Sequence, residues 1–360
     1  MRTLRQTFVH NKKMTAVVNG RLLLSLYLIV PLCCAIVGFD YLVLNRTLLR
    51  EFLPLQPSDW ALWAIVFNLP HIVSSFVTLA DKEYIKYYGV KFLAALTVIV
   101  AIVVITMNII PMFLSYQHSQ YVYACFYAFF ATYTMHHILS QQFGIGMMMA
   151  RIPQSTLYQV MRMCSTMSAT SLYMMVFAKN SLQSIHAFGT SAQTLILIIS
   201  GISIVCASYC AVRLIQQSDR ILGRGLILSN VLMLYATWVC MLLGYTVFVI
   251  LIPRFVHDIT AFIIYSAHDH NRNIRVRHNY FYRCLAILPI TPLVLCPILA
   301  IGLAYSVESF TAMSDKFFNE QGYFLKIGVQ VLFIFGLFHY YIEGFVWKKD
   351  GIHRHSLKFK

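Results

Sequence analysis

The stretch PRFVHDITAFIIYSAHDHNRNIRVR, residues 253–277, combines the apolar character of a membrane-crossing helix with three histidines and two aspartates. Ionisable side chains are costly inside a bilayer, so they usually face a protein interior and mark a functional site. His257 and His268 are eleven residues apart, which at about 100° per residue puts both on one stripe of a helix. Asp258 and Asp269 repeat this spacing on the neighbouring stripe. The stretch therefore predicts a buried helix that carries a site.

The composition of the whole chain agrees with a membrane location. Its 360 residues are 59% hydrophobic and 11% charged, whereas soluble domains are nearer to about 45–50% apolar and about 25% charged. We therefore predict an all-α polytopic integral membrane protein, with residues 1–360 as a single transmembrane domain. The net charge of +15 lies in loops and tails, where Lys and Arg set topology. It therefore favours insertion among membrane lipids over binding to nucleic acid.

About ten transmembrane helices follow from the rule that each span needs about 20 mainly apolar residues. The expected spans are 22–44, 59–80, 90–115, 121–148, 156–178, 190–214, 226–252, 253–277, 281–305 and 326–347. Pro253 is expected to separate the seventh span from the eighth. With that break, basic loops alternate with poorly charged ones, which places the tails 1–21 and 348–360 in the cytoplasm. The short loops and tails suggest a bacterial inner membrane.

The thirteen histidines fall into two classes. Six lie in loops or tails, where we expect solvated side chains: His10, His118, His186, His278, His353 and His355. Seven lie within or at the ends of predicted spans: His71, His136, His137, His257, His268, His270 and His339. The second class supplies the candidate ligands.

Two of these histidines carry local signals of a site. His71 follows Pro70, which removes a backbone donor and often accompanies a site in a membrane helix. His339 and Glu343 are four residues apart, so they share one helix face. Imidazole and carboxylate together suit iron or zinc. A hydrogen-bonded pair that only fixes packing is the alternative for His339 and Glu343.

His136 and His137 are adjacent, so their side chains diverge by about 100°. Both can bind one ion only if it lies between helices; otherwise one binds and the other supports it. Gln141 is one turn beyond His137, on the same face. His268 and His270 suit a helix end better than a regular helix, and Asp269 between them could orient a ligand imidazole.

Depth in the membrane brings these residues together. Spans alternate in direction, so positions near mid-membrane or in the inner half of spans two, four, eight and ten can converge. His257 lies about 16 Å above His268 on a regular helix, so it is expected in an upper layer with His71. The predicted ligands are His71, His136, His137, His257, His268, His270, His339 and Glu343, supported by Asp258, Asp269 and Gln141. Iron, as one ion or a pair, is favoured over zinc.

The order of these motifs resembles that of histidine-rich membrane non-haem iron oxygenases, and most closely the bacterial retinal-forming β-carotene dioxygenases of the Brp/Blh group. The motifs are Pro70–His71, His136–His137, His268–Asp269–His270 and His339–Glu343. PHIVSS stands in place of the PHGxxD-type motif of that group, and the HxxxH and HxxHH boxes of fatty-acid desaturases do not occur. The resemblance implies chemistry of O₂ at iron.

Together these features predict a membrane oxygenase, hydroxylase or desaturase that acts on a lipid or isoprenoid-like substrate and draws electrons from a donor protein. Two alternatives remain. A transporter would use the His, Asp and Glu residues as a relay for protons or as a substrate site. An electron-transfer protein would hold haem b between histidine pairs. A relay strings its groups along a path, whereas a metal site gathers them at one point.

Overall fold

The structure, a computed structural model, describes residues 16–54, 69–177, 186–187, 190–320, 327–346 and 351–360. Most of the basic N-terminal tail, the first part of the second predicted span and residues 348–350 of the C-terminal tail lie outside the described residues. The described chain is helical apart from one antiparallel pair of short strands, β1 (His186–Ala187) and β2 (Thr190–Ser191). The predicted all-α class is confirmed.

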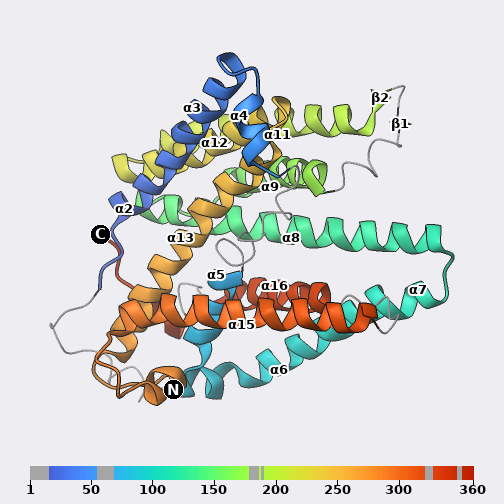
Figure 1. Ribbon diagram of the computed structural model, residues 1–360. Helices are drawn as coiled ribbons and strands as arrows, with labels where there is room; N and C mark the ends of the chain where they lie inside the picture. Colours follow the sequence, from blue (N-terminus) through green and yellow to red (C-terminus); the bar gives the residue numbers. More distant parts are fainter. Residues whose placement is uncertain (1–15, 55–68, 178–185, 188–189, 321–326, 347–350) are drawn as a thin grey trace.

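The helical elements follow one another along the whole described chain (Figure 1). They are α2 (Gly20–Ser25), the 3-10 turn η1 (Leu26–Leu28), α3 (Ile29–Leu42), α4 (Thr47–Phe52), α5 (Leu69–Leu79), α6 (Lys82–Val104), the π-helical turn η4 (Ile105–Ile109), α7 (Ile110–Met112), α8 (Tyr116–Ala150), α9 (Thr156–Phe177), α11 (Ala192–Ile215), α12 (Ile221–Leu242), α13 (Thr246–Asn273), α14 (Tyr280–Cys284), α15 (Pro292–Glu320), α16 (Ile327–Val346) and the 3-10 turn η5 (Ile352–Ser356).

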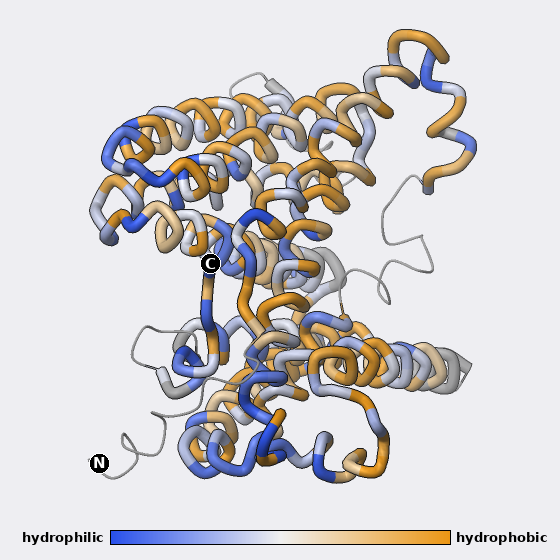
Figure 2. The backbone as a smooth tube through the Cα atoms, turned by 90° about the vertical axis from the view of Figure 1, so that its left-hand side faces the viewer, coloured by the Kyte–Doolittle hydropathy of each residue, from blue (hydrophilic) through white to orange (hydrophobic). Residues whose placement is uncertain are grey.

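Six helices of the described chain are long and apolar enough to cross a membrane, which fits a multi-pass membrane protein. They are Gly20–Leu42, Lys82–Met112, Ala192–Ile215, Ile221–Leu242, Thr246–Asn273 and Pro292–Met313. The predicted count of about ten spans is not supported. The other four expected segments form α5, α8, α9 and α16; α5 has only 11 described residues, and α8 and α9 contain many His, Gln, Ser and Thr side chains. Figure 2 shows hydrophobic residues along most of the helices.

The predicted break at Pro253 is wrong. α13 runs without interruption from Thr246 to Asn273 and contains Pro253. The chain turns instead at Gly244, whose φ of +80° is readily adopted only by glycine. Pro253 removes one backbone donor, but a membrane helix tolerates proline where neighbouring groups compensate. The boundary between the two predicted spans therefore lies before α13, and the whole helix is available to position side chains.

α13 is the helix that links the two parts of the molecule. Val249 and Val256, in its first half, belong to a large hydrophobic cluster shared with α3, α8, α9, α11 and α12. Ala261 and Tyr265 belong to a second cluster with α5, α14 and α15. Figure 1 shows α13 passing obliquely from the first group of helices to the second. Residues near position 258 therefore lie between the two groups.

Both ends of the described chain lie side by side. Val18 pairs with Phe359 in a parallel bridge, and the N–H of Gly20 donates to the carbonyl of Lys360 at 2.8 Å. The side chain of Asn271 on α13 donates to the carbonyl of Ser356 at 2.9 Å. The C-terminal segment is therefore packed against the helices. The expectation that His353 is solvated is wrong, because its side chain is 0% exposed.

Candidate metal centre

Four helices each contribute one imidazole to a closed cluster in which every imidazole contacts two others. His71 comes from α5, His137 from α8, His257 from α13 and His339 from α16. The ring centroids of His71 lie 5.0 Å from those of His257 and of His339. The centroid of His137 lies 5.4 Å from that of His257 and 5.1 Å from that of His339. Side chains separated by up to 268 positions in the sequence therefore meet at one place.

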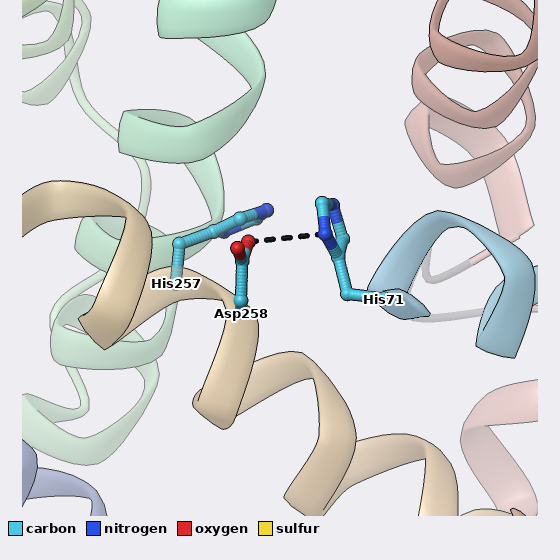
Figure 3. Close-up of side chains that lie close together, drawn as sticks. All are labelled: His71, His257 and Asp258. Atoms are coloured by element: carbon cyan, nitrogen blue, oxygen red, sulfur yellow. Dashed lines mark ion pairs between the residues drawn. The ribbon is translucent and has the colours of Figure 1, made fainter. Parts of the chain in front are cut away.

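Two carboxylates complete this cluster. Asp258 Oδ1 lies 3.0 Å from His71 Nδ1, and Glu343 Oε2 lies 3.1 Å from His137 Nε2 and 3.8 Å from His339 Nε2. Figure 3 shows His257 and Asp258 extending from α13 toward His71 on α5. The six side chains form two groups, His71–His257–Asp258 and His137–His339–Glu343, and within each group the potential ligand atoms all lie within 4.8 Å of one another. We call these groups the Asp258 trio and the Glu343 trio.

The polar atoms of the two trios are buried and poorly satisfied. All six side chains are at most 7% exposed. Neither ring nitrogen of His71 or His257 has a hydrogen-bond partner among the described residues, and neither does either carboxylate oxygen of Asp258. Burying one such group without a partner costs about 1–3 kcal/mol. A bound cation would remove this cost, because imidazole and carboxylate are suitable ligands for it.

The residue types of each trio match a known ligand set. Each supplies two histidines and one carboxylate, a combination that in non-haem iron oxygenases leaves coordination positions open. The i to i+4 spacing of His339 and Glu343 places both on one face of α16. His257 and Asp258 are adjacent on α13, and both side chains lie next to His71. The donor set therefore fits iron, and it would also accept zinc.

Two neighbouring polar groups, Ser75 and Gln141, hold the ligands in place. Ser75 Oγ, one turn after His71 on α5, lies 2.9 Å from His339 Nδ1, which leaves Nε2 facing Glu343. Gln141 donates a hydrogen bond to Glu343 Oε2. Such outer partners fix the orientation of ligands and tune a metal site. The supporting role of Gln141 stays a prediction, with which this contact is compatible.

Arg254 and Ser75 are the contacts that sequence reasoning missed. The Arg254 side chain is 3% exposed, and its Nη1 lies 4.0 Å from Asp258 Oδ1. A buried arginine next to a carboxylate offsets the negative charge that the trio brings into the protein. The sequence carried a signal for Arg254, because it stands four positions before Asp258 and a basic and an acidic residue at this spacing can interact on a helix.

A large cavity adjoins the Glu343 trio. Its volume is about 710 Å³, within the range of about 300–1,000 Å³ that small-molecule sites occupy. His137, Gln141 and Glu343 line it together with Tyr133 and Tyr340. Aromatic and aliphatic side chains provide most of the remaining wall. The candidate centre thus adjoins a space of the size that a small-molecule ligand occupies.

Some predicted ligands lie apart from the two trios. His136 lines the cavity, and its Nε2 is 3.5 Å from Ser140 Oγ. His268, Asp269 and His270 are buried at the far end of α13, about 16 Å from His257 along the helix axis. His268 Nε2 lies 3.0 Å from Tyr84 Oη, and His268 Nδ1 lies 2.9 Å from Asp269 Oδ1. Asp258, predicted as a supporting residue, instead stands among the potential ligands.

Among known proteins, no family model, no curated protein and no solved structure matches this chain.

Proposed function

We propose that the protein is a membrane oxidoreductase that holds iron at the two trios, one ion in each, and oxidises a hydrophobic substrate with O₂. One observation carries the proposal: two adjoining sets of two histidines and one carboxylate are buried together beside a cavity of about 710 Å³. The reaction class is hydroxylation, desaturation or oxidative cleavage of a lipid-like molecule, with electrons supplied by a donor protein.

The chain's own residues perform three tasks in this proposal. The four imidazoles and two carboxylates hold the ions, and Gln141 and Ser75 keep Glu343 and His339 oriented. The low exposure of the ligands excludes bulk water from the centre, which protects reactive species from side reactions. Bound iron supplies the redox chemistry with O₂ that amino-acid side chains lack.

The geometry favours a metal centre over the two alternatives. A proton relay needs groups arranged along a path, but the imidazoles of His71, His137, His257 and His339 form a closed cluster with centroids 5.0–5.4 Å apart. Haem b would have to lie between two facing rings. Each of the four rings instead has two other imidazoles in edge-on contact, and Tyr340 packs against His137 and His339. This arrangement has no pair of facing imidazoles with the space of a flat macrocycle between them.

We also propose that both termini face the cytoplasm of a bacterial inner membrane. The basic loops and tails support this orientation. Pairing of Val18 with Phe359 supports placing the two ends of the chain on the same side.

Metal analysis of detergent-purified protein tests the proposal. We expect about two iron ions per chain after anaerobic loading with Fe(II). His339→Ala should lose at least the ion of the Glu343 trio, because it removes one of three ligands. His268→Gln is the matched control: it also replaces a buried histidine in this part of the protein, but outside both trios, and should keep its iron. A wild-type protein that binds no stoichiometric metal, or an equal loss in both variants, would contradict the proposal.

A further inference from the structure

The cavity beside the Glu343 trio runs along α8. Its wall includes His137, Gln141, Gly144 and Met148 from that helix. From His137 to Met148 is eleven residues, or about 16 Å along the helix axis. The candidate metal centre lies at the His137 end. The other end reaches the C-terminal segment, because Leu357 and Phe359 also line the cavity.

Two arginines line this cavity away from the centre. Arg354 belongs to η5, and its Nη2 lies 3.1 Å from the Sδ of Met148. Its guanidinium also sits 4.8 Å above the centre of the Phe359 ring. Arg162 comes from α9 and sits 5.6 Å above the ring of Tyr158. Because α9 returns antiparallel to α8, Arg162 lies between the Arg354 end and the centre.

Neither guanidinium is neutralised by a carboxylate among the described residues. The ion pairs of the described chain involve neither Arg162 nor Arg354. Among the described residues of the cavity wall the one acidic side chain is Glu343, which is engaged by His137 and Gln141. Arg162 Nε is buried without a hydrogen-bond partner, and burial lowers the pKa of Arg354. Two cations thus line a partly buried space in which, among the described residues, no carboxylate pairs with them.

Much of the rest of the wall is apolar, as a hydrocarbon chain requires. Ile145, Ala261, Ile264 and the ring of Tyr340 contribute to it, beside the polar side chains of His136 and Ser140. A guanidinium presents parallel N–H donors that match a carboxylate or phosphate. Pairing with such a group offsets the cost of holding the charge away from water.

We propose that the cavity binds an amphiphile with an anionic head group, a carboxylate or a phosphate, between Arg354 and Arg162, and that its hydrocarbon chain extends toward His137 and Glu343. Binding of this amphiphile is inferred from the cavity and its two arginines alone. Oxidation of its hydrocarbon chain, at the end nearest the metal centre, is a further step that rests on the proposed function. A purely hydrocarbon substrate such as a carotene would leave both arginines without a partner.

Binding to the full-length, iron-loaded protein in a neutral detergent tests this inference. The probe is a fluorescent long-chain fatty acid, displaced by palmitate, by methyl palmitate, by a long-chain alkyl phosphate or by inorganic phosphate. We expect palmitate and the alkyl phosphate to displace the probe. The methyl ester should need a concentration at least about tenfold higher, which corresponds to a binding free energy weaker by about 1.4 kcal/mol. Inorganic phosphate alone should not displace it at comparable concentrations.

Charge-neutral variants then locate the head group. Arg354→Gln and Arg162→Gln should each lower the affinity for palmitate at least about tenfold and leave the affinity for methyl palmitate unchanged. Arg354→Lys should recover part of the loss, since lysine keeps the charge but not the planar fork. Arg213→Gln, at an exposed arginine near the end of α11, should bind like the wild type. Thermal unfolding of each variant shows that it is folded.

The outcomes separate this inference from the proposed function. Equal affinity for the acid and its methyl ester, unchanged binding in both glutamine variants, or displacement by inorganic phosphate alone would overturn the inference. Iron-loaded protein that fails to bind the acid overturns the inference and leaves the metal centre standing. Protein that binds the acid but holds no iron supports the inference and contradicts the proposed function.

Discussion

α13 carries the dipeptide His-Asp twice, at His257–Asp258 and at His268–Asp269, and the two copies have opposite surroundings. In the second copy both ring nitrogens of His268 face an oxygen, at 2.9 Å from Asp269 and at 3.0 Å from Tyr84. In the first copy neither nitrogen of His257 has a hydrogen-bond partner among the described residues. Asp258 there lies 3.0 Å from His71 Nδ1, but neither of its oxygens meets hydrogen-bond geometry with a described residue.

The neighbouring helices explain this difference. α6 and α14 bring hydroxyl groups to the second copy, where Tyr282 also donates to Asp269. α5, α8 and α16 bring three further imidazoles to the first copy. A satisfied polar network fixes packing, whereas an unsatisfied one is costly unless something else binds there. The same pair of residues is therefore a structural element at one end of the helix and a candidate ligand pair near its middle.

Replacing each aspartate by asparagine gives the largest expected effect and the most direct test of this contrast. Asp258→Asn should weaken iron binding by more than the roughly 10–100-fold that loss of an outer-shell partner costs, because it removes a charged ligand. Asp269→Asn should leave iron binding unchanged and lower stability instead. Titration of the apo-protein with Fe(II) and thermal unfolding measure the two effects. Equal iron affinities in the two variants would erase the distinction between the copies.

The sequence predicted part of this arrangement. Helical periodicity placed His257 and His268 on one stripe, and the depth argument placed His257 in an upper layer with His71, as the 5.0 Å between their ring centroids shows. The four-residue spacing of His339 and Glu343 placed them on one helix face, and in the structure His339 Nε2 lies 3.8 Å from Glu343 Oε2. These predictions rest on local helix geometry, which sequence spacing determines.

The rest depends on packing between helices that spacing does not determine. Nothing in the sequence shows that Tyr84 and Tyr282 satisfy His268 and Asp269, since those partners come from α6 and α14. Pro253 was read as a break because proline lacks a backbone donor, but α13 continues through it. The predicted count of about ten spans is not supported among the described residues, where a helix such as α8, with its His, Gln, Ser and Thr side chains, is less apolar than its length suggests.

Removing one hydroxyl from the second copy should have a smaller effect. Tyr282 is 0% exposed, and Tyr282→Phe deletes the group that donates to Asp269. A lost hydrogen bond to a charged partner costs about 1.5–3 kcal/mol, so we expect a lower free energy of unfolding in detergent and unchanged iron content. Tyr280→Phe, at a position 46% exposed, is the control and should unfold like the wild type. Loss of iron from Tyr282→Phe would mean that the contacts of His268–Asp269 influence metal binding at His257–Asp258, so that the two copies are not independent.

The smallest expected effect comes from His353, which packs against the second copy. Its ring centroid lies 3.6 Å from that of Tyr84 and 5.4 Å from that of His268. Burial, and then the electrostatic influence of His268 and Arg272, lower the pKa of His353 from 6.5 to about 2. The titratable and charged groups around it are Tyr84, Tyr88, His268, Arg272 and, across a small gap, Glu343.

This pKa shift has a definite sign in stability. Between pH 2 and pH 6.5 the unfolded chain binds a proton at His353 that the folded chain does not, so stability falls as the pH falls through this window. Between about pH 7 and about pH 5.5 this single group should cost about 1 kcal/mol. His353→Phe keeps an aromatic ring against Tyr84 but cannot titrate, so its thermal unfolding midpoint should fall less over the same interval. If both proteins lose the same stability, His353 is already protonated in the folded state, and its packing against Tyr84 and His268 does not keep the ring neutral.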